Sequence, residues 1–120
     1  MIKKYELTKE KKEVYGKTLF RIKALIDGKW FKKGELGGWI EKEQNLNQEG
    51  DAWVFGDALV SGDAQVSGNA WVYDDAQVSG NARVSGNARV YDDAQVYGNA
   101  WVFGDAQVYG KIKLNNTLCS

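Results

Sequence analysis

Acidic residues recur along the second half of the chain at a fixed interval. Asp74 and Asp75 are followed eighteen residues later by Asp92 and Asp93, and Asp57 stands eighteen residues before Asp75. Carboxylate oxygens are ligands that calcium prefers, and a row of them can imitate the phosphates of a nucleic acid. Aspartate also suits exposed turns, where water solvates its charge. Three interpretations therefore compete for these residues: a cation site, a phosphate mimic and a solvated turn.

The sequence favours the solvated turn. It contains no Asp-x-Asp-x-Asp-Gly loop, and Lys111, eighteen residues after Asp93, offsets part of the charge. Like charges stacked at the spacing of neighbouring strands also repel one another. We therefore predict no metal ion, and we expect a convex corner without a pocket, which argues against a hydrolase that relies on carboxylates alone.

Aromatic residues recur at the same interval as the carboxylates. The two resulting columns are Trp53, Trp71, Arg89 and Gln107, and, two positions further along, Phe55, Tyr73, Tyr91 and Tyr109. Exposed aromatic planes beside an arginine suit a protein partner, a nucleobase or a sugar, and they equally suit an interface between copies of the chain. The predicted binding site or subunit interface consists of Trp53, Phe55, Trp71, Tyr73, Arg89, Tyr91 and Tyr109.

A six-residue repeat that begins at Gly50 must position both the aspartates and the aromatic residues. Most repeats have Gly-Asp or Gly-Asn before Ala-x-Val-x, and two have Asp-Asp there; the alternation predicts a short strand with alanine and valine facing inward. The residues before each strand predict a corner, because they accept left-handed backbone angles. Residues 68–85 match the chain shifted by six, twelve or eighteen residues at ten, eight or fourteen positions. Three repeats therefore form one coil, in which Asp74 and Asp92 share a corner and stack about 4.8 Å apart.

The repeat resembles the left-handed β-helix of hexapeptide-repeat proteins, whose motif is an aliphatic residue with a small residue four places later. Val54 with Ala58 fits this motif, and the match continues to Val108. The resemblance covers roughly residues 50–115 and implies an all-β, left-handed parallel β-helix with eighteen residues per coil. Such proteins are commonly homotrimers, so the resemblance also implies that the aromatic columns form a subunit interface.

Enzymes of the hexapeptide-repeat family use a histidine as general base, and related carbonic anhydrases bind zinc through histidines. The chain has no histidine, so the key residue for either chemistry is missing. Cys119 has no histidine to activate it as a nucleophile, and the sequence has no P-loop and no Gly-x-Ser-x-Gly motif. We therefore predict that the protein is not an enzyme and has no cofactor, with a residual transferase as an alternative.

We predict two segments, a β cap with its lead-in over residues 1–49 and the β-helix over residues 50–120. A cap covers the open end of the coil, where an unpaired edge would pair with other chains. At the other end, Ile112 and Leu118 stand where the repeat has alanine. We expect these larger residues to form a C-terminal plug of the core.

The cap is expected to contain three strands. Alternating apolar positions over residues 20–26 indicate one strand, and Asp27-Gly28 predicts a hairpin turn into a returning strand over residues 29–33. Residues 3–7 are expected to add the third strand. In the segment that leads into the β-helix, two imperfect repeats are expected, with Ile40 and Leu46 at their alanine positions.

Charge and composition exclude several function classes. The 16 basic and 16 acidic residues cancel, with a net charge of +4 on residues 1–49 (12 basic, 8 acidic) and −4 on residues 50–120 (4 basic, 8 acidic). This asymmetry is too mild to indicate nucleic-acid binding. No apolar run is long enough to span a membrane, and the first residues lack the apolar stretch of a secretory signal, so we expect neither a leader nor membrane association. The single cysteine is consistent with a reducing cytoplasm.

The stretch ELGGWIEKEQNLNQEGDAWV also resembles small proteins of phages and prophages that join such a cap to hexapeptide repeats. This resemblance implies a product that acts in the cytoplasm of an infected or lysogenic bacterial cell. We predict stoichiometric binding that inhibits or sequesters a host component, either a defence protein or its nucleotide signal. The alternative is a purely structural module, self-assembling or accessory to a virion, without a ligand.

Overall fold

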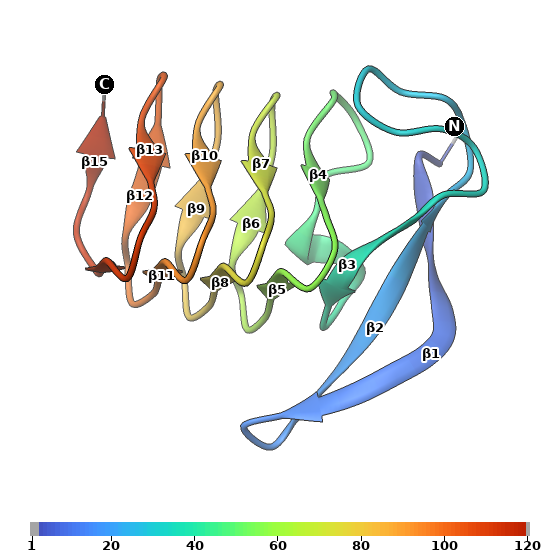
Figure 1. The fold of residues 1–120 in the computed structure, drawn as a ribbon, viewed down its shortest axis with the longest axis horizontal. Helices are drawn as coiled ribbons and strands as arrows, with labels where there is room; N and C mark the ends of the chain where they lie inside the picture. The colour runs from blue at the N-terminus through green and yellow to red at the C-terminus, as the bar shows by residue number, and fades with distance from the viewer. Residues whose placement is uncertain (1–2, 120) are drawn as a thin grey trace.

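The computed structural model describes residues 3–119, in which columns of short strands wind into a coil with a long hairpin at its N-terminal end (Figure 1). In this described part, the one helical element is the 3₁₀ helix η1 (Glu43–Asn45), and no helix is long and apolar enough to cross a membrane. The strands are β1 (Tyr5–Val14), β2 (Lys17–Ala24), β3 (Leu36–Ile40), β4 (Trp53–Val54), β5 (Leu59–Val60), β6 (Gln65–Val66), β7 (Trp71–Val72), β8 (Gln77–Val78), β9 (Arg83–Val84), β10 (Arg89–Val90), β11 (Gln95–Val96), β12 (Trp101–Phe103), β13 (Gln107–Val108), β14 (Lys113–Leu114) and β15 (Leu118–Cys119).

The strands form three sheets that run along the coil. Two sheets are four-stranded, in the orders β13-β10-β7-β4 and β15-β12-β9-β6. The third has seven strands in the order β1-β2-β3-β5-β8-β11-β14, because the N-terminal hairpin pairs with β3 and β3 pairs in parallel with β5. The chain is therefore an all-β parallel coil with the N-terminal strands joined to one of its faces.

The register confirms one coil for every eighteen residues. Strand β7 pairs with β10, β8 with β11 and β9 with β12, each in parallel and each with residue i opposite residue i+18. Backbone amides continue this ladder between the coils, as in the bond from Trp71 N to the carbonyl of Ala88 at 3.0 Å. The left-handed sense of the coil stays a prediction.

The core consists of the alanine and valine of each repeat. From Ala52 to Val108 these side chains are at most 1 % exposed, which confirms that they face inward. Beyond them, Leu114 and Leu118 pack against the core, but Ile112 is 47 % exposed. The expected contribution of Ile112 to a plug is wrong, because its side chain turns to solvent rather than over the last coil.

The first coil has two residues more than the regular eighteen, and the last has two fewer, because Val102 pairs with Leu118; Leu118 thus takes a valine position, and its expected alanine position is wrong. Ile40 pairs with Val60, and Leu46 bridges to Val66, so both stand twenty residues before their partners. They occupy valine positions, and the expected alanine positions are wrong. The register returns to eighteen at Trp53, which pairs with Trp71.

The two extra residues lie in the corner before β4 and bring Gln48 against the start of β1. The Gln48 side-chain oxygen accepts from Lys4 N at 2.7 Å and Tyr5 N at 3.2 Å, and its amide nitrogen donates to Tyr5 O at 3.2 Å. Lys4 is buried and donates to the carbonyl of Ala52 at 2.8 Å. The insertion therefore fastens the N-terminal strand to the coil.

The cap differs from the sequence prediction at its turn. Strand β2 overlaps the strand expected over residues 20–26, but its hairpin partner is β1, through a turn at Tyr15 (φ 52°) and Gly16 (φ 77°). Residues 29–33 form a loop rather than a returning strand. The reason is tertiary: Phe31 in this loop is 3 % exposed and stacks on the Trp53 ring at 4.2 Å.

The corners differ in how closely successive coils approach. An added Cβ at Gly80 would lie 2.9 Å from Gly98 N, whereas nothing lies within 4 Å of one at Gly56, although φ is positive at both. The corner that contains Gly56 also contains Asp74 and Asp92, which both have a φ of 59°. This corner has room for a side chain, which explains why only here aspartate replaces the glycine of the repeat.

We expect Gly80→Ala to be clearly more destabilising than Gly56→Ala. Both substitutions strain a left-handed backbone, but only Gly80→Ala also forces two backbones apart, so the difference should be about 1–2 kcal/mol. Urea unfolding of both variants, followed by circular dichroism, measures it. Equal losses of stability would show that the corners are equally spacious.

Candidate functional site

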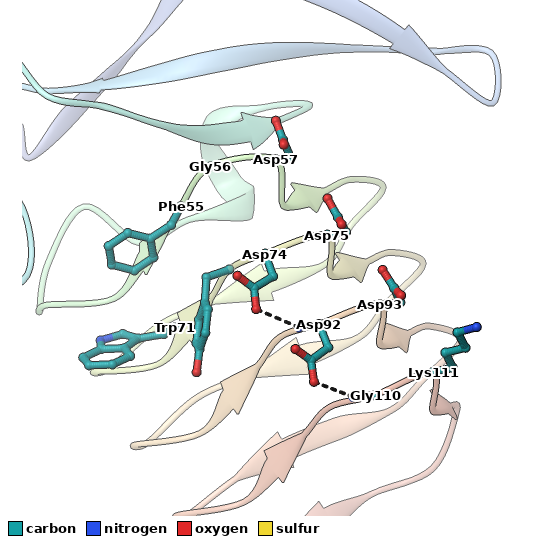
Figure 2. A pocket seen from close by; sticks show the side chains of 11 residues that line it. Phe55, Gly56, Asp57, Trp71, Asp74, Asp75, Asp92, Asp93, Gly110 and Lys111 are labelled. Atoms are coloured by element: carbon teal, nitrogen blue, oxygen red, sulfur yellow. Dashed lines mark hydrogen bonds between the residues drawn. The ribbon is translucent and has the colours of Figure 1, made fainter.

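An open groove of about 1010 Å³ runs beside the column β4-β7-β10-β13, along the corner that follows these strands (Figure 2). We call it the aromatic–acidic groove. The side chains that line it are those of Phe55, Trp71, Tyr73, Asp57, Asp74, Asp75, Asp92, Asp93 and Lys111. The expectation of a convex corner without a pocket is wrong, because the aromatic side chains rise beside the corner and form a wall.

The tyrosines of the second aromatic column form a ladder along the coil. The rings of Tyr73 and Tyr91 stack with centroids 4.9 Å apart and planes 4° from parallel, and those of Tyr91 and Tyr109 follow at 5.4 Å and 13°. Phe55 meets Tyr73 edge-on at 6.4 Å. Burial, and to a lesser extent Tyr91, raises the pKa of Tyr73, so its hydroxyl stays protonated near neutral pH. The ladder extends past the groove, since Tyr91 and Tyr109 do not line it.

Trp71 connects the ladder with the N-terminal loop. Its half-buried ring meets Trp30 edge-on at 4.3 Å, and the guanidinium of Arg89 lies over it at 4.4 Å. The indole nitrogen is buried and has no hydrogen-bond partner among the described residues. One face of Trp71 is therefore already occupied by a cation of the chain itself, and the residue also lines the groove.

Trp53 does not belong to the exposed band. It is 1 % exposed, because Phe31 stacks on it and Tyr5 meets its edge at 6.2 Å. Sequence analysis missed Trp30 and Phe31, which follow no period and so gave no signal beyond two adjacent aromatics in a polar loop. The structure thus brings together Phe55, Trp71, Tyr73, Arg89, Tyr91 and Tyr109 and removes Trp53.

The aspartates form two rows, as Figure 2 shows. In one row, the Asp74 carboxylate accepts from Asp92 N at 3.3 Å and the Asp92 carboxylate accepts from Gly110 N at 3.1 Å. These carboxylates satisfy backbone groups of the next coil, which is a structural role for the residues that interrupt the repeat. In the other row, Asp57, Asp75 and Asp93 project to solvent, and Lys111 follows them.

The charge of these carboxylates is largely uncompensated. The ion pairs of the described residues join Lys3 to Glu43, Lys17 to Glu41, Arg21 to Glu10 and Lys42 to Asp63, and all lie outside the groove. Within residues 3–119, no three potential metal ligands lie close enough together to hold an ion. The groove therefore offers a row of separate negative charges rather than a chelating site.

This arrangement suits the recognition of cationic groups. Aromatic faces attract ammonium and guanidinium groups, and carboxylates form charge-assisted hydrogen bonds with them. Phosphate or carboxylate groups of a ligand would instead face five aspartates and one lysine.

Comparisons with known proteins match part of the coil. The family model described as YdcK Beta solenoid repeat matches residues 64–80, 76–92 and 94–110. The protein named uncharacterized acetyltransferase YdcK, of Escherichia coli (strain K12), is 36 % identical over an alignment of 59 residues, and the alignment covers 43 % of this chain. The matched part spans only 18 % of that relative's length. Together with the eighteen-residue register and the alanine and valine core, the matches identify the chain as a β-helix repeat protein, a parallel β-solenoid.

Proposed function

We propose that the chain is a non-catalytic protein that acts by stoichiometric binding, and that its aromatic–acidic groove takes a cationic segment of a partner protein. One observation carries the proposal: the aromatic residues and five uncompensated carboxylates line the same groove. Arginine and lysine side chains are the groups that both surfaces attract. The row of Asp57, Asp75 and Asp93 spans two coil spacings, about 10 Å, so the long basic side chains of an extended segment can reach along it.

The charge of the groove favours one of the two host targets expected from the sequence. A nucleotide signal would bring phosphates toward the aspartates, which repel them. A host defence protein with an exposed basic segment suits the groove better. We therefore propose such a protein as the component that is inhibited or sequestered, in the cytoplasm of an infected or lysogenic bacterial cell.

Self-assembly is the second candidate, and the exposed end of the aromatic ladder favours it. Tyr109 is 50 % exposed, and Arg89 is also exposed, so the two columns offer a surface to another copy of the chain. A homotrimer built on this surface is expected to dissociate in the Trp71→Ala variant. Light scattering after size exclusion separates the candidates, because a trimer that persists when Trp71 is removed has its interface elsewhere.

A transferase is the remaining alternative, because the E. coli relative is named an acetyltransferase. The chain has no histidine to act as general base. Turnover of an acyl donor that Asp75→Asn and Asp93→Asn abolish would establish this alternative and contradict the non-catalytic proposal.

Neutralising the exposed row of carboxylates should abolish most of the binding. A fluorescein-labelled peptide with alternating arginines is titrated with the protein and with the triple variant Asp57→Asn/Asp75→Asn/Asp93→Asn, and anisotropy reports binding. We expect at least about a tenfold weaker affinity in the variant, because three charge-assisted contacts are lost. Affinity should also fall with salt, since the pairs are exposed.

Two controls make this measurement specific. Asp105→Asn removes a carboxylate that lies on another corner and accepts from Asn87 Nδ2 at 3.3 Å, so it should leave the affinity unchanged. The same peptide with citrulline in place of arginine has the same shape without the charge and should not bind. Equal binding of both peptides, or equal losses in both variants, would contradict the proposal.

A further inference from the structure

A second cleft, of about 480 Å³, lies between the hairpin β1–β2 and the face formed by β5, β8, β11 and β14. Figure 1 shows the hairpin extending beyond the end of the coil and bending back beneath that face. We call this space the overhang cleft. It shares no lining residue with the aromatic–acidic groove, so the two sites are separate.

The hairpin is aimed over the coil by its own backbone. The pairing of β1 with β2 shifts register between Leu7 and Lys11, and such an irregularity bends and twists a two-stranded ribbon. Leu19, 1 % exposed, anchors the hairpin at the base of the cleft. Beyond this anchor, the turn holds Tyr15 at 86 % exposure. The hairpin therefore overhangs the face without packing fully onto it.

The lining of the overhang cleft has the opposite charge from the groove. It contains the ammonium groups of Lys17 and Lys113 and no carboxylate. Lys17 Nζ lies 3.9 Å from Glu41 Oε1, at the outer limit of an ion pair, whereas Lys113 belongs to none of the ion pairs of the described residues. An anion can therefore enter this cleft without facing a negative wall.

The remaining lining offers planar and hydrogen-bonding groups. Tyr15 contributes a ring from the hairpin, and Tyr97, 37 % exposed, contributes one from the coil. Gln77 in β8 and Gln95 in β11 pair in register, and both line the cleft, so the coil contributes two neighbouring side-chain amides. Aromatic rings stack on other planar rings, and amides can donate to and accept from the edge of a heterocycle.

We propose that the overhang cleft binds an anionic ligand that carries a planar ring, as a nucleoside monophosphate does. The ring lies against Tyr97 and Tyr15, the glutamine amides bind its edge, and Lys113, with Lys17, binds the phosphate. This site goes beyond the groove and its cationic partner, because it lies on another face and selects the opposite charge. The failure of either proposal would leave the other intact.

Calorimetric titration with adenosine 5′-monophosphate tests the site. We expect saturable binding that weakens at least about tenfold in Lys113→Ala and in Tyr97→Ala, since each removes a principal contact. Adenosine without the phosphate, and inorganic phosphate without the ring, should both bind more weakly than the nucleotide. The absence of saturable heat at about 1 mM nucleotide would overturn the proposal.

Matched substitutions outside the overhang cleft provide the control. Lys111→Ala and Tyr109→Ala remove the same residue types from the neighbouring corner and column, and they should leave the affinity for the nucleotide unchanged. Losses as large as those of Lys113→Ala and Tyr97→Ala would overturn the proposal. Tyr15→Ser changes a side chain that is 86 % exposed, so it should preserve the urea midpoint while it weakens nucleotide binding. An unchanged affinity in this variant would count against the role of the hairpin.

Discussion

Replacing Trp53 with alanine is expected to lower the free energy of unfolding by about 3–5 kcal/mol, the range for a large aromatic residue removed from a core. The Trp53 ring is 1 % exposed, stacks on Phe31 at 4.2 Å and meets Tyr5 at 6.2 Å. Its removal leaves a cavity at the junction where both the loop and β1 rest on the first coil. Urea unfolding followed by circular dichroism measures the loss.

Trp101 provides the control for this prediction. It occupies the corresponding outward position on another face and is 44 % exposed, so Trp101→Ala should cost less than about 1 kcal/mol. Similar costs for the two substitutions would show that Phe31 and Tyr5 do not hold Trp53 in a core. A large cost at Trp53 alone would show that the coil depends on its cap.

Raising the pH from about 7 to 10 is expected to increase the free energy of unfolding by about 2–3 kcal/mol through Lys4. Burial lowers the pKa of Lys4 from 10.5 to about 8, and the opposing effect of Asp51 is smaller. Between these values the unfolded chain binds more protons than the folded chain, so stability rises with pH. As the pH falls from 10.5 to 8, the unfolded chain takes up this proton and the folded chain does not, so the stability is lost over this range; below about pH 8 both states carry the charge and the loss is complete.

Tyr5 reverses the trend at higher pH. Burial, and to a lesser extent the negative charge of Glu43, raises the pKa of the Tyr5 hydroxyl far above the ordinary value of 10.0. This hydroxyl donates to the carbonyls of Glu43 and Leu46. Above pH 10 the unfolded chain releases this proton while the folded chain keeps it, so stability falls. Urea unfolding at a series of pH values should therefore show a maximum near pH 10.

The variant Lys4→Met isolates the contribution of the lysine. It keeps a side chain of similar length without a titratable group, so the rise below pH 10 should disappear. The fall above pH 10 should persist, because Tyr5 is unchanged. A rise of the same size in Lys4→Met would assign the effect to another group.

The coil itself could be predicted from the sequence because its rules are local and repeated. Alternation along Ala-x-Val-x determines which side chains face inward, and the eighteen-residue identity determines which residues stack. The corner shared by Asp74 and Asp92 follows from the same count, and the structure confirms it through the bond from Asp92 N to the Asp74 carboxylate. The eighteen-residue period could not show that this corner of the coil has more space than the others, enough for a Cβ.

The cap could not be predicted in the same way, because tertiary packing decides it. Asp27-Gly28 has the sequence of a hairpin turn, but the Phe31 ring lies over Gly28, where an added Cβ would be 2.2 Å away. The turn that does form, at Tyr15, is flanked by charged residues with little apolar alternation. The groove was missed for a related reason: its wall depends on how outward rings lean, which periodicity does not specify.

The regular register makes the length of the coil a variable that can change without redesign of the core. Duplicating residues 74–91 would insert one more coil, with a further aspartate pair and a further tyrosine, and lengthen the aromatic–acidic groove by about 4.8 Å. The overhang cleft would not grow with it, because the hairpin has a fixed reach. The length of the aromatic and acidic surface is thus open to stepwise change, while the dimensions of the overhang cleft stay constant.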